Sequence, residues 1–369
     1  MKTDEIYADI AKQLSKGVWK EGEQLPTERV LADQYGVSRP TISRVLNRLR
    51  DEGQLRRVVG SGSYLTKPEQ PIMTPHKKLG LFVPGLGKGE IFEPICARIA
   101  ELSHEYDFNL IWGSVPAEQS EDLPDKLLQT ARRFVELDLD GIFFQPIERE
   151  AGAENKNMQI VSLLDRASIP VVLLDSDYLA FPEQSGHDLV GIDNSAAAYR
   201  LCQHFLRQGA TRVDFLWQPN TAGTYLLRLM GYREALYKAG IKPDQGCESE
   251  GSPSDIDFVR DMVDRGARNI ICANDETAAL LMRSLEVLDL KVPEDIRIAG
   301  FDDVKYAHLA RVPLTTMRQP CRKLGELALN TLIGRIENPS LPARSILIEA
   351  QLCERESSKV PDKARAKER

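Results

Sequence analysis

Residues 25 to 65 constrain the fold more than any other part of the chain. Their apolar residues recur at the i, i+3, i+4 spacing of two short packed helices, and Gly36 falls where the chain must turn between them. Ser38 is a suitable N-cap, and Pro40 lies in the first turn of a second helix predicted over Ser38 to Glu52. The spacing therefore predicts a helix-turn-helix.

A two-stranded ribbon is predicted directly after the second helix. Leu55 to Val59 and Ser63 to Leu65 have the composition of short strands, and Gly60-Ser61-Gly62 separates them. A helix-turn-helix followed by such a ribbon is a winged helix-turn-helix, in which the second helix is shaped to enter a DNA major groove.

The charge of the chain supports contact with DNA. Residues 36 to 67 hold seven Lys or Arg and two acidic residues, a local net charge of +5. Residues 71 to 369 hold 36 basic and 45 acidic residues, a net charge of −9. A solvated basic helix face is the alternative, but the turn, the cap and the wing occur together with the charge. The pattern indicates a DNA reader joined to a body that DNA repels.

This segment resembles the GntR family of bacterial transcription factors over its whole length. The resemblance is carried by Leu25-Pro26-Thr27-Glu28-Arg29, by Gly36-Val37-Ser38-Arg39 and by the wing glycines. It implies that Arg29, Arg39 and a wing glycine contact DNA. Many members carry Arg where this chain has Ser43, which leaves the operator sequence open. The predicted DNA-binding residues are Arg29, Ser38, Arg39, Pro40, Thr41, Ser43, Arg44 and Gly62.

The remaining composition is that of an ordinary globular protein, with 42% hydrophobic and 28% charged residues. No apolar run is long enough to span a bilayer, and no signal peptide precedes the first helix, so we expect a cytoplasmic protein. The six cysteines show no ligand spacing, and the five histidines are scattered. We therefore expect reduced cysteines, no metal and no cofactor.

The chain divides after the predicted wing. Three prolines between Lys67 and Lys78 indicate a linker. Beyond it, β-branched apolar runs alternate with amphipathic stretches, which predicts an α/β fold with doubly wound parallel sheets, long enough for two lobes. The predicted domains are a winged helix-turn-helix at 1–67, a linker at 68–78, a two-lobed effector domain at 79–355 and a charged, disordered tail at 356–369.

This second region resembles the effector domain of the LacI/GalR regulators. The resemblance is carried by GIDNSAAAYRLCQHFLRQGATRV, by RLMGYREALYKAGI and by the stretch from ICANDETAALL to GFDD. It implies the periplasmic-binding-protein type I fold, with three crossovers between two lobes and a sugar-sized cleft. A GntR-type reader joined to such a domain is similar to the arabinose-repressor subgroup.

Polar residues follow the predicted strands, where doubly wound sheets bind ligands. The resemblance implies that Arg228, Asn274, Asp275 and Asp302 face an effector. Carboxylates accept hydrogen bonds from vicinal hydroxyls and Arg donates a planar fork, so the chemistry suits a sugar. Phe92 is a candidate platform for the apolar face of that sugar. The predicted effector-binding residues are Phe92, Arg228, Asn274, Asp275 and Asp302.

Alternatives remain for individual residues. Asp275 could be a helix N-cap, and Asp303 is more often a residue that bonds within a loop. Trp112, Trp217 and Tyr306 also follow strands, but aromatic residues at such positions more often belong to the core.

These patterns predict a DNA-binding transcriptional regulator that is a repressor and not an enzyme. The expected partners are double-stranded operator DNA, a mono- or disaccharide effector and a second copy of the chain, without membrane contact. The alternatives are a sugar-binding enzyme, an activator, or a regulator that responds to a purine or a sugar phosphate. The enzyme alternative lacks opposed carboxylates, a nucleophile elbow and a phosphate-binding loop.

Overall fold

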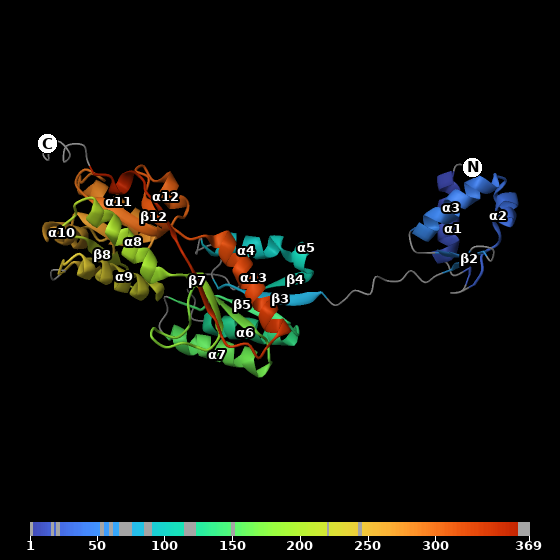
Figure 1. Ribbon diagram of the computed structural model, residues 1–369, viewed down its shortest axis with the longest axis horizontal. Coiled ribbons are helices and arrows are strands. Elements are labelled where there is room, and N and C mark those ends of the chain that lie inside the picture. Colours follow the sequence, from blue (N-terminus) through green and yellow to red (C-terminus); the bar gives the residue numbers. More distant parts are fainter. Residues whose placement is uncertain are drawn as a thin grey trace. The chain divides into compact units, whose positions relative to one another are not determined.

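The computed structural model describes residues 3–15, 18–19, 23–51, 55–58, 62–65, 76–84, 91–113, 123–148, 152–219, 221–242 and 246–360. The chain forms two compact units, Met1–His76 and Lys77–Arg369 (Figure 1).

The first unit is the predicted winged helix-turn-helix. Its elements are α1 (Thr3–Ser15), α2 (Glu28–Tyr35), α3 (Arg39–Asp51), β1 (Leu55–Val58) and β2 (Gly62–Leu65). The two strands pair antiparallel, with Leu55 opposite Leu65. The helices bury one apolar core together with β1, made by Ile6, Ile10, Leu25, Leu31, Ala32, Ile42, Val45, Leu46, Leu49 and Leu55.

Local signals define the ends of α2. The Thr27 hydroxyl accepts the Val30 N–H at 3.4 Å, which caps the start of the helix. Gly36 ends it with a φ of 64°, a left-handed conformation that costs glycine little. The predicted sharp turn at Gly36 is confirmed, and α3 begins three residues later.

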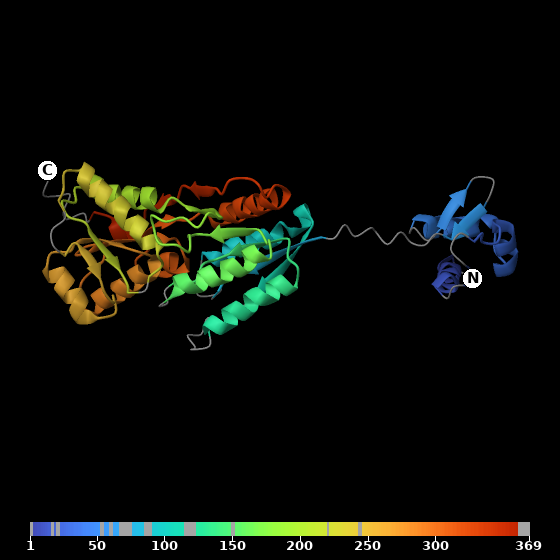
Figure 2. The same ribbon diagram turned by 90° about the horizontal axis from the view of Figure 1, so that it is seen from below.

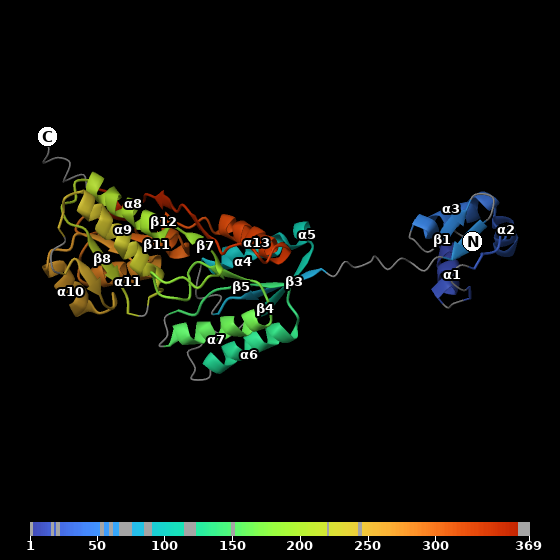
Figure 3. The same cartoon turned by 60° about the horizontal axis from the view of Figure 1, so that its bottom comes forward.

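The second unit contains two lobes, each built on a six-stranded sheet. The sheet of lobe 1 is parallel throughout, in the order β13-β7-β6-β5-β3-β4. Helices α4 and α13 cover one face of it, and α6 and α7 cover the other (Figure 3). Its strands are β3 (Lys77–Phe82), β4 (Phe108–Gly113), β5 (Gly141–Phe144), β6 (Val171–Leu174), β7 (Asp188–Ile192) and β13 (Ser345–Ile348). Its helices are α4 (Phe92–Glu101), α5 (Ser103–Tyr106), α6 (Leu123–Glu136), α7 (Ala153–Arg166) and α13 (Cys321–Glu337).

The sheet of lobe 2 has the order β14-β12-β11-β10-β8-β9 and is parallel except for β14. Helices α8 and α9 pack together on one face, and α10 and α11 on the other (Figure 3). Its strands are β8 (Asp214–Trp217), β9 (Glu248–Glu250), β10 (Asn269–Cys272), β11 (Arg297–Asp302), β12 (Thr315–Arg318) and β14 (Gln351–Cys353). Its helices are α8 (Asn194–Arg207), α9 (Thr224–Lys238), α10 (Ile256–Asp264), α11 (Asp275–Val287), α12 (Lys305–Leu309) and the 3-10 turn Glu356–Ser358.

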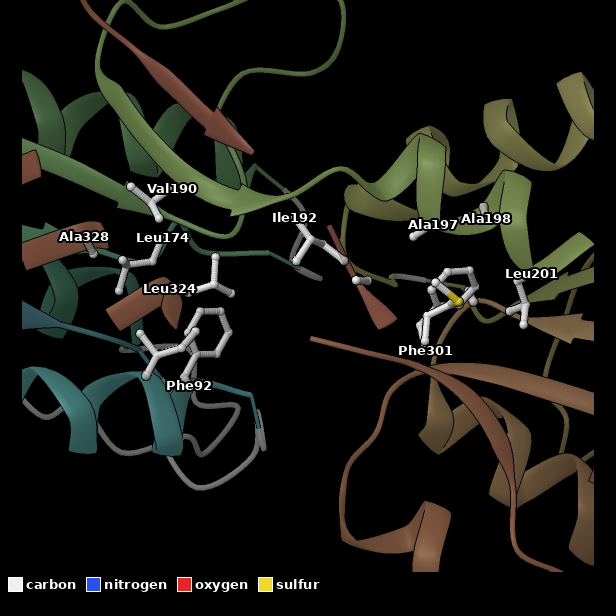
Figure 4. Close-up of a cluster of buried hydrophobic side chains, with 14 of the residues drawn as sticks. Phe92, Leu174, Val190, Ile192, Ala197, Ala198, Leu201, Phe301, Leu324 and Ala328 are labelled. Atoms are coloured by element: carbon white, nitrogen blue, oxygen red, sulfur yellow. The ribbon is translucent and has the colours of Figure 1, made fainter. Parts of the chain in front are cut away.

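Three chain segments pass between the lobes (Figure 2). The first joins β7 to α8, the second joins β12 to α13, and the third joins β13 to β14. One cluster of buried apolar residues extends from lobe 1 into lobe 2, with Leu174 and Val190 on one side and Leu201 and Phe301 on the other (Figure 4). The predicted α/β fold with parallel sheets, two lobes and three crossovers is confirmed.

One predicted domain boundary is wrong. Strand β3 begins at Lys77, inside the linker predicted at 68–78. The linker residues 68–75 lie outside the described part of the chain.

The prediction of a disordered tail from residue 356 is also wrong for its first residues. Ser357 and Ser358 are buried, and the hydroxyl of each has a hydrogen-bond partner on the lobe 2 sheet. The Ser357 hydroxyl donates to the Ile298 carbonyl at 2.7 Å, and the Ser358 hydroxyl lies 2.7 Å from that of Thr315. These hydrogen bonds offset the cost of burying the two polar hydroxyls. Residues 361–369 lie outside the described part.

Candidate functional sites

The exposed face of α3 carries the first candidate site. Arg39 and Arg44 are exposed there, and Arg29 is exposed on α2. The hydroxyls of Ser38 and Thr41 lie 2.9 Å apart at the start of α3. An open groove runs along this face, lined by Glu28, Arg39, Pro40, Ser43, Arg44 and Asn47.

The predicted DNA-binding residues therefore gather at α2, the start of α3 and the wing. Gly62 opens β2 and stands opposite Val58 of β1. Arg48 differs from the others, because its guanidinium carbon lies 3.9 Å above the Tyr7 ring of α1. Arg48 is exposed like Arg39 and Arg44, but its guanidinium packs on Tyr7 at the surface of the unit.

Arg228 is the centre of the second candidate site. It lies on α9, it is only 4% exposed, and its guanidinium carbon lies 4.5 Å from the centre of the Phe301 ring. Its Nε donates to Asn194 Oδ1 at 2.8 Å, and one Nη donates to the Ala273 carbonyl. Arg228 thereby connects the start of α8 with the ends of β10 and β11.

Asp302 pairs with this guanidinium at the end of β11. The Nη2 of Arg228 lies 3.3 Å from Asp302 Oδ1, and Gln319 Nε2 donates to the same oxygen at 2.8 Å. Asp302 has a φ of 105°, a conformation that strains a residue with a side chain. Strain of this kind often marks a functional site, and here it orients the carboxylate toward Arg228.

Asp275 is buried within lobe 2, and its contact with an effector stays a prediction. It is 0% exposed, and both its oxygens accept hydrogen bonds, from the Thr316 hydroxyl at 2.6 Å and the Val304 N–H at 3.1 Å. Burial, followed by the nearby charge of Asp302, raises the pKa of Asp275 well above its usual value. The capping role considered for Asp275 belongs to Asn274, whose Oδ1 accepts the Thr277 N–H at 2.8 Å.

Asp303 bonds within its own lobe, as the alternative interpretation predicted. Its buried carboxylate pairs with Arg318 at 2.5 Å and with Arg355 at 2.6 Å. Burial alone would raise the pKa of Asp303, but these two guanidinium groups hold it below its usual value.

The aromatic candidates differ in their surroundings. Phe92 is the first residue of α4 and belongs to the apolar cluster that includes Leu174 and Leu324 (Figure 4). It is 6% exposed, and its contact with an effector stays a prediction. The ring of Trp217, at the end of β8, stacks on Tyr225 with centroids 5.5 Å apart.

The structure adds polar groups that the sequence reasoning did not select. Among the described residues, five buried side-chain polar atoms lack a hydrogen-bond partner. Four of these atoms belong to residues at or just after the carboxyl ends of β5, β6, β8 and β12, namely Gln145 Oε1, Asp175 Oδ1, Trp217 Nε1 and Gln319 Oε1. Position after a strand was the signal that selected Asn274 and Asp302, and the same signal applied to lobe 1 would have found Gln145 and Asp175.

No described helix has the length and hydropathy needed to cross a membrane. No group of three His, Cys, Asp or Glu side chains in the described ranges could hold a metal ion.

Comparison with known proteins finds relatives of both units of the chain. Residues 2–65 match the family described as bacterial regulatory proteins, gntR family, and residues 202–358 match the periplasmic binding protein-like domain. The arabinose metabolism transcriptional repressor of Geobacillus stearothermophilus is 26% identical over 364 residues, which cover 96% of this chain and 97% of that protein. The chain is a transcriptional regulator. It joins a gntR-type reader to a periplasmic binding protein-like domain.

Partial matches extend the comparison to other regulators. The ribose operon repressor of Escherichia coli is 32% identical over 197 residues, 52% of this regulator and 58% of that protein. A LacI family regulator from Enterococcus faecium, solved with bound ribose, superposes with a TM-score of 0.61 at 21% identity, over 76% of this chain and 98% of that one. This last likeness shows the fold of the effector domain.

Proposed function

We propose that this regulator is a cytoplasmic repressor without enzymatic activity, whose operator binding is controlled by a sugar held between its two effector lobes. The supporting observation is the pair of buried Arg228 and half-buried Asp302, with buried polar atoms that lack partners at neighbouring strand ends. A guanidinium and a carboxylate side by side offer donors and acceptors to adjacent hydroxyls. The names of the two relatives, which concern arabinose and ribose, agree with a sugar.

The fold provides a route from the sugar to the DNA reader. Gln145 and Asp175 belong to lobe 1, whereas Arg228 and Asp302 belong to lobe 2. A sugar that contacts both lobes favours the arrangement in which they are closed, because a ligand shifts an equilibrium by its differential affinity for the two states. Lobes joined by a few crossover segments move as rigid bodies. Closure then changes the spacing of the two attached DNA readers, and with it their fit to the operator.

Titration of the sugar with and without DNA tests this proposal. Coupling between two ligands is reciprocal, so saturating operator should weaken sugar binding by the same factor by which the sugar weakens operator binding. Calorimetry with L-arabinose and D-ribose, paired with fluorescence anisotropy on labelled operator, measures both factors. Equal sugar affinity with and without operator would contradict allosteric control.

We expect the DNA contacts to depend on Arg39. Arg39→Ala should weaken operator binding by about 1–3 kcal/mol if its guanidinium reads a base. Arg48→Ala is the matched control, because Arg48 packs on Tyr7 within the same unit and should leave operator affinity much less affected. Anisotropy with specific and scrambled duplexes measures both variants. Unchanged specific binding in Arg39→Ala would place the base-reading residue elsewhere.

We also expect a homodimer on a roughly palindromic operator. One winged helix-turn-helix reads few base pairs, and two-fold symmetry doubles the contacts. The effector domain should supply most of the dimer contact, so a fragment ending at Gln70 should be monomeric and bind DNA weakly. Sedimentation of the fragment and the full chain checks this, and equally tight dimers would disprove it.

A further inference from the structure

The chain turns sharply at the end of β11, at two consecutive aspartates. Asp302 and Asp303 have positive φ angles of 105° and 57°, a region that few residues other than glycine adopt. Such a conformation is unfavourable and persists only where surrounding contacts hold it. The N–H of the next residue, Val304, is held by Asp275 Oδ2 at 3.1 Å. The contacts of the two aspartate side chains therefore help to decide the shape of this turn.

The carboxylate of Asp303 binds two arginines. Its side chain is 3% exposed, and its Oδ2 accepts a hydrogen bond from the Nε of Arg318 at 2.5 Å. Its Oδ1 accepts a hydrogen bond from the Nη2 of Arg355 at 2.6 Å. The Nε2 of the half-exposed His308 also lies 3.3 Å from this Oδ1. Hydrogen bonds between charged groups are short and strong, so Asp303 is fixed from both sides.

Both arginines lie next to a crossover between the lobes. Arg318 ends β12, and only residues 319–320 separate it from α13 of lobe 1. Arg355 follows β14, and only residues 349–350 separate β14 from β13 of lobe 1. Asp303 thus connects the end of β11 to the lobe 2 ends of the second and third crossovers.

The same turn belongs to the candidate effector site. Asp302 stands opposite Arg318 in the pairing of β11 with β12, and Gln319 Nε2 donates to Asp302 Oδ1 at 2.8 Å. Two consecutive residues at the start of the second crossover therefore bind the two consecutive aspartates. Because a buried ion pair resists separation, a shift of Asp302 on ligand binding carries Asp303 and its arginines with it.

We propose that Asp303 is a positioning residue, which couples an effector at Asp302 to the movement of the lobes. It does this without contact to the effector, by holding the turn at the end of β11 to the second and third crossovers. The proposal rests on the proposed function, because it assumes that a sugar contacts Asp302. Without the charge of Asp303, the sugar still binds but the lobes respond to it less.

The physical basis is the difference between the sugar affinities of the open and closed states. A ligand shifts the equilibrium between two states only by its differential affinity for them. When the turn is held to the crossovers, Asp302 reaches the sugar in one arrangement of the lobes only. When the turn moves independently, Asp302 reaches the sugar in both arrangements, and the differential affinity decreases. Loss of coupling without loss of binding therefore distinguishes a positioning residue from a contact residue.

The test measures the coupling factor, which is the ratio of the sugar Kd with saturating operator to the sugar Kd without it. Calorimetry on the full chain would first screen the common pentoses and hexoses, including L-arabinose and D-ribose, and then use the sugar that binds most tightly. The proteins are wild type, Asp303→Asn, Arg318→Gln and the double variant. Asparagine also adopts positive φ angles, so Asp303→Asn removes the charge and leaves the backbone preference unchanged.

Asp289→Asn is the matched control. Asp289 is an exposed aspartate of lobe 2 with a φ of 58°, so the same change is made in the same backbone conformation, away from the crossovers.

We expect a coupling factor of about tenfold or more in wild type and in Asp289→Asn. Asp303→Asn should bind the sugar within about threefold of wild type, but its coupling factor should fall below about threefold. Arg318→Gln should reduce the factor in the same direction. The double variant should lose no more than Asp303→Asn alone, because both changes break the same ion pair.

Loss of stability has a separate readout. Circular dichroism would show that each variant is folded at the temperature of the titration, where reduced stability no longer affects the binding constants. If Asp303→Asn does not fold, Arg318→Gln decides the question, because the Arg318 side chain is half exposed and its replacement costs less stability.

The outcomes separate the two proposals. An unchanged coupling factor in Asp303→Asn or in Arg318→Gln would overturn the role of Asp303 and leave a sugar-controlled repressor standing. Loss of sugar binding in a folded Asp303→Asn would also overturn it, because Asp303 would then be part of the sugar site itself. If no sugar binds wild type, or if operator leaves its affinity unchanged, the proposed function fails and this inference fails with it.

Discussion

Replacing Arg228 with alanine should abolish the response to the effector and destabilise the effector domain by about 3–5 kcal/mol. The guanidinium is buried and bonds to Asn194, to the Ala273 carbonyl and to Asp302. Removing one partner of a buried pair leaves the other charge uncompensated, which is why the expected cost is large. Chemical denaturation measures the stability, and operator release by sugar measures the response.

Two further variants separate charge from geometry. Arg228→Lys keeps the positive charge but cannot reproduce the planar fork that reaches three partners, so it should retain more stability than alanine and still lose the response. Arg233→Ala is the control on the same helix, where Arg233 is half exposed and pairs with Glu248. Its effect should stay within about 1 kcal/mol, as for other surface pairs. Equal losses in Arg228→Ala and Arg233→Ala would contradict the central role of Arg228.

Much of the fold could be predicted because local signals are strong where elements are long or buried. The turn at Gly36 has the predicted position, and the two wing strands lie within one residue of theirs. Strand β12 was not predicted, since its two threonines are buried only through contacts distant in sequence. Thr316, for example, appears to be a surface residue until its hydroxyl is seen to donate to Asp275.

Contacts between residues distant in sequence also limited the prediction of the candidate site. Arg228 and Asp302 could be selected from sequence because each stands at a recognisable motif or strand end, and the structure brings them together. Nothing in the sequence distinguishes Asn274 from Asp275, yet the first caps α11 and the second points into lobe 2. The proximity of Glu148, Asp175 and Asp302 could not be predicted, because they follow β5, follow β6 and end β11, far apart in the sequence.

One buried carboxylate joins, within lobe 1, the segments that lead to all three crossovers. Asp188 begins β7, which continues into the first crossover. Its oxygens accept from Arg335 of α13, the helix after the second crossover, at 2.9 Å, and from the backbone N–H of Arg344 at 2.8 Å. Arg344 directly precedes β13, which leads into the third.

Asp188→Ala should therefore destabilise the effector domain by about 3–5 kcal/mol, because it leaves the Arg335 guanidinium partly buried without its anion. Asp188→Asn should be intermediate, since its one carbonyl oxygen can still accept a hydrogen bond. Asp165→Ala, which removes an exposed carboxylate from the same lobe, should change the free energy of unfolding by at most about 1 kcal/mol.

The effect of Asp188→Ala should depend on pH in a defined direction. Burial would raise the pKa of Asp188, but hydrogen bonds from Arg335 and Arg344 hold it below its ordinary value of 3.8. The folded state therefore binds fewer protons than the unfolded state, and the stabilisation is present above 3.8 and lost as the pH falls through the folded pKa. Denaturation of wild type and Asp188→Ala should differ fully at pH 7 and progressively less in acid below about pH 4. A difference that persisted undiminished in strong acid would mean that packing, and not the charge of Asp188, joins these segments.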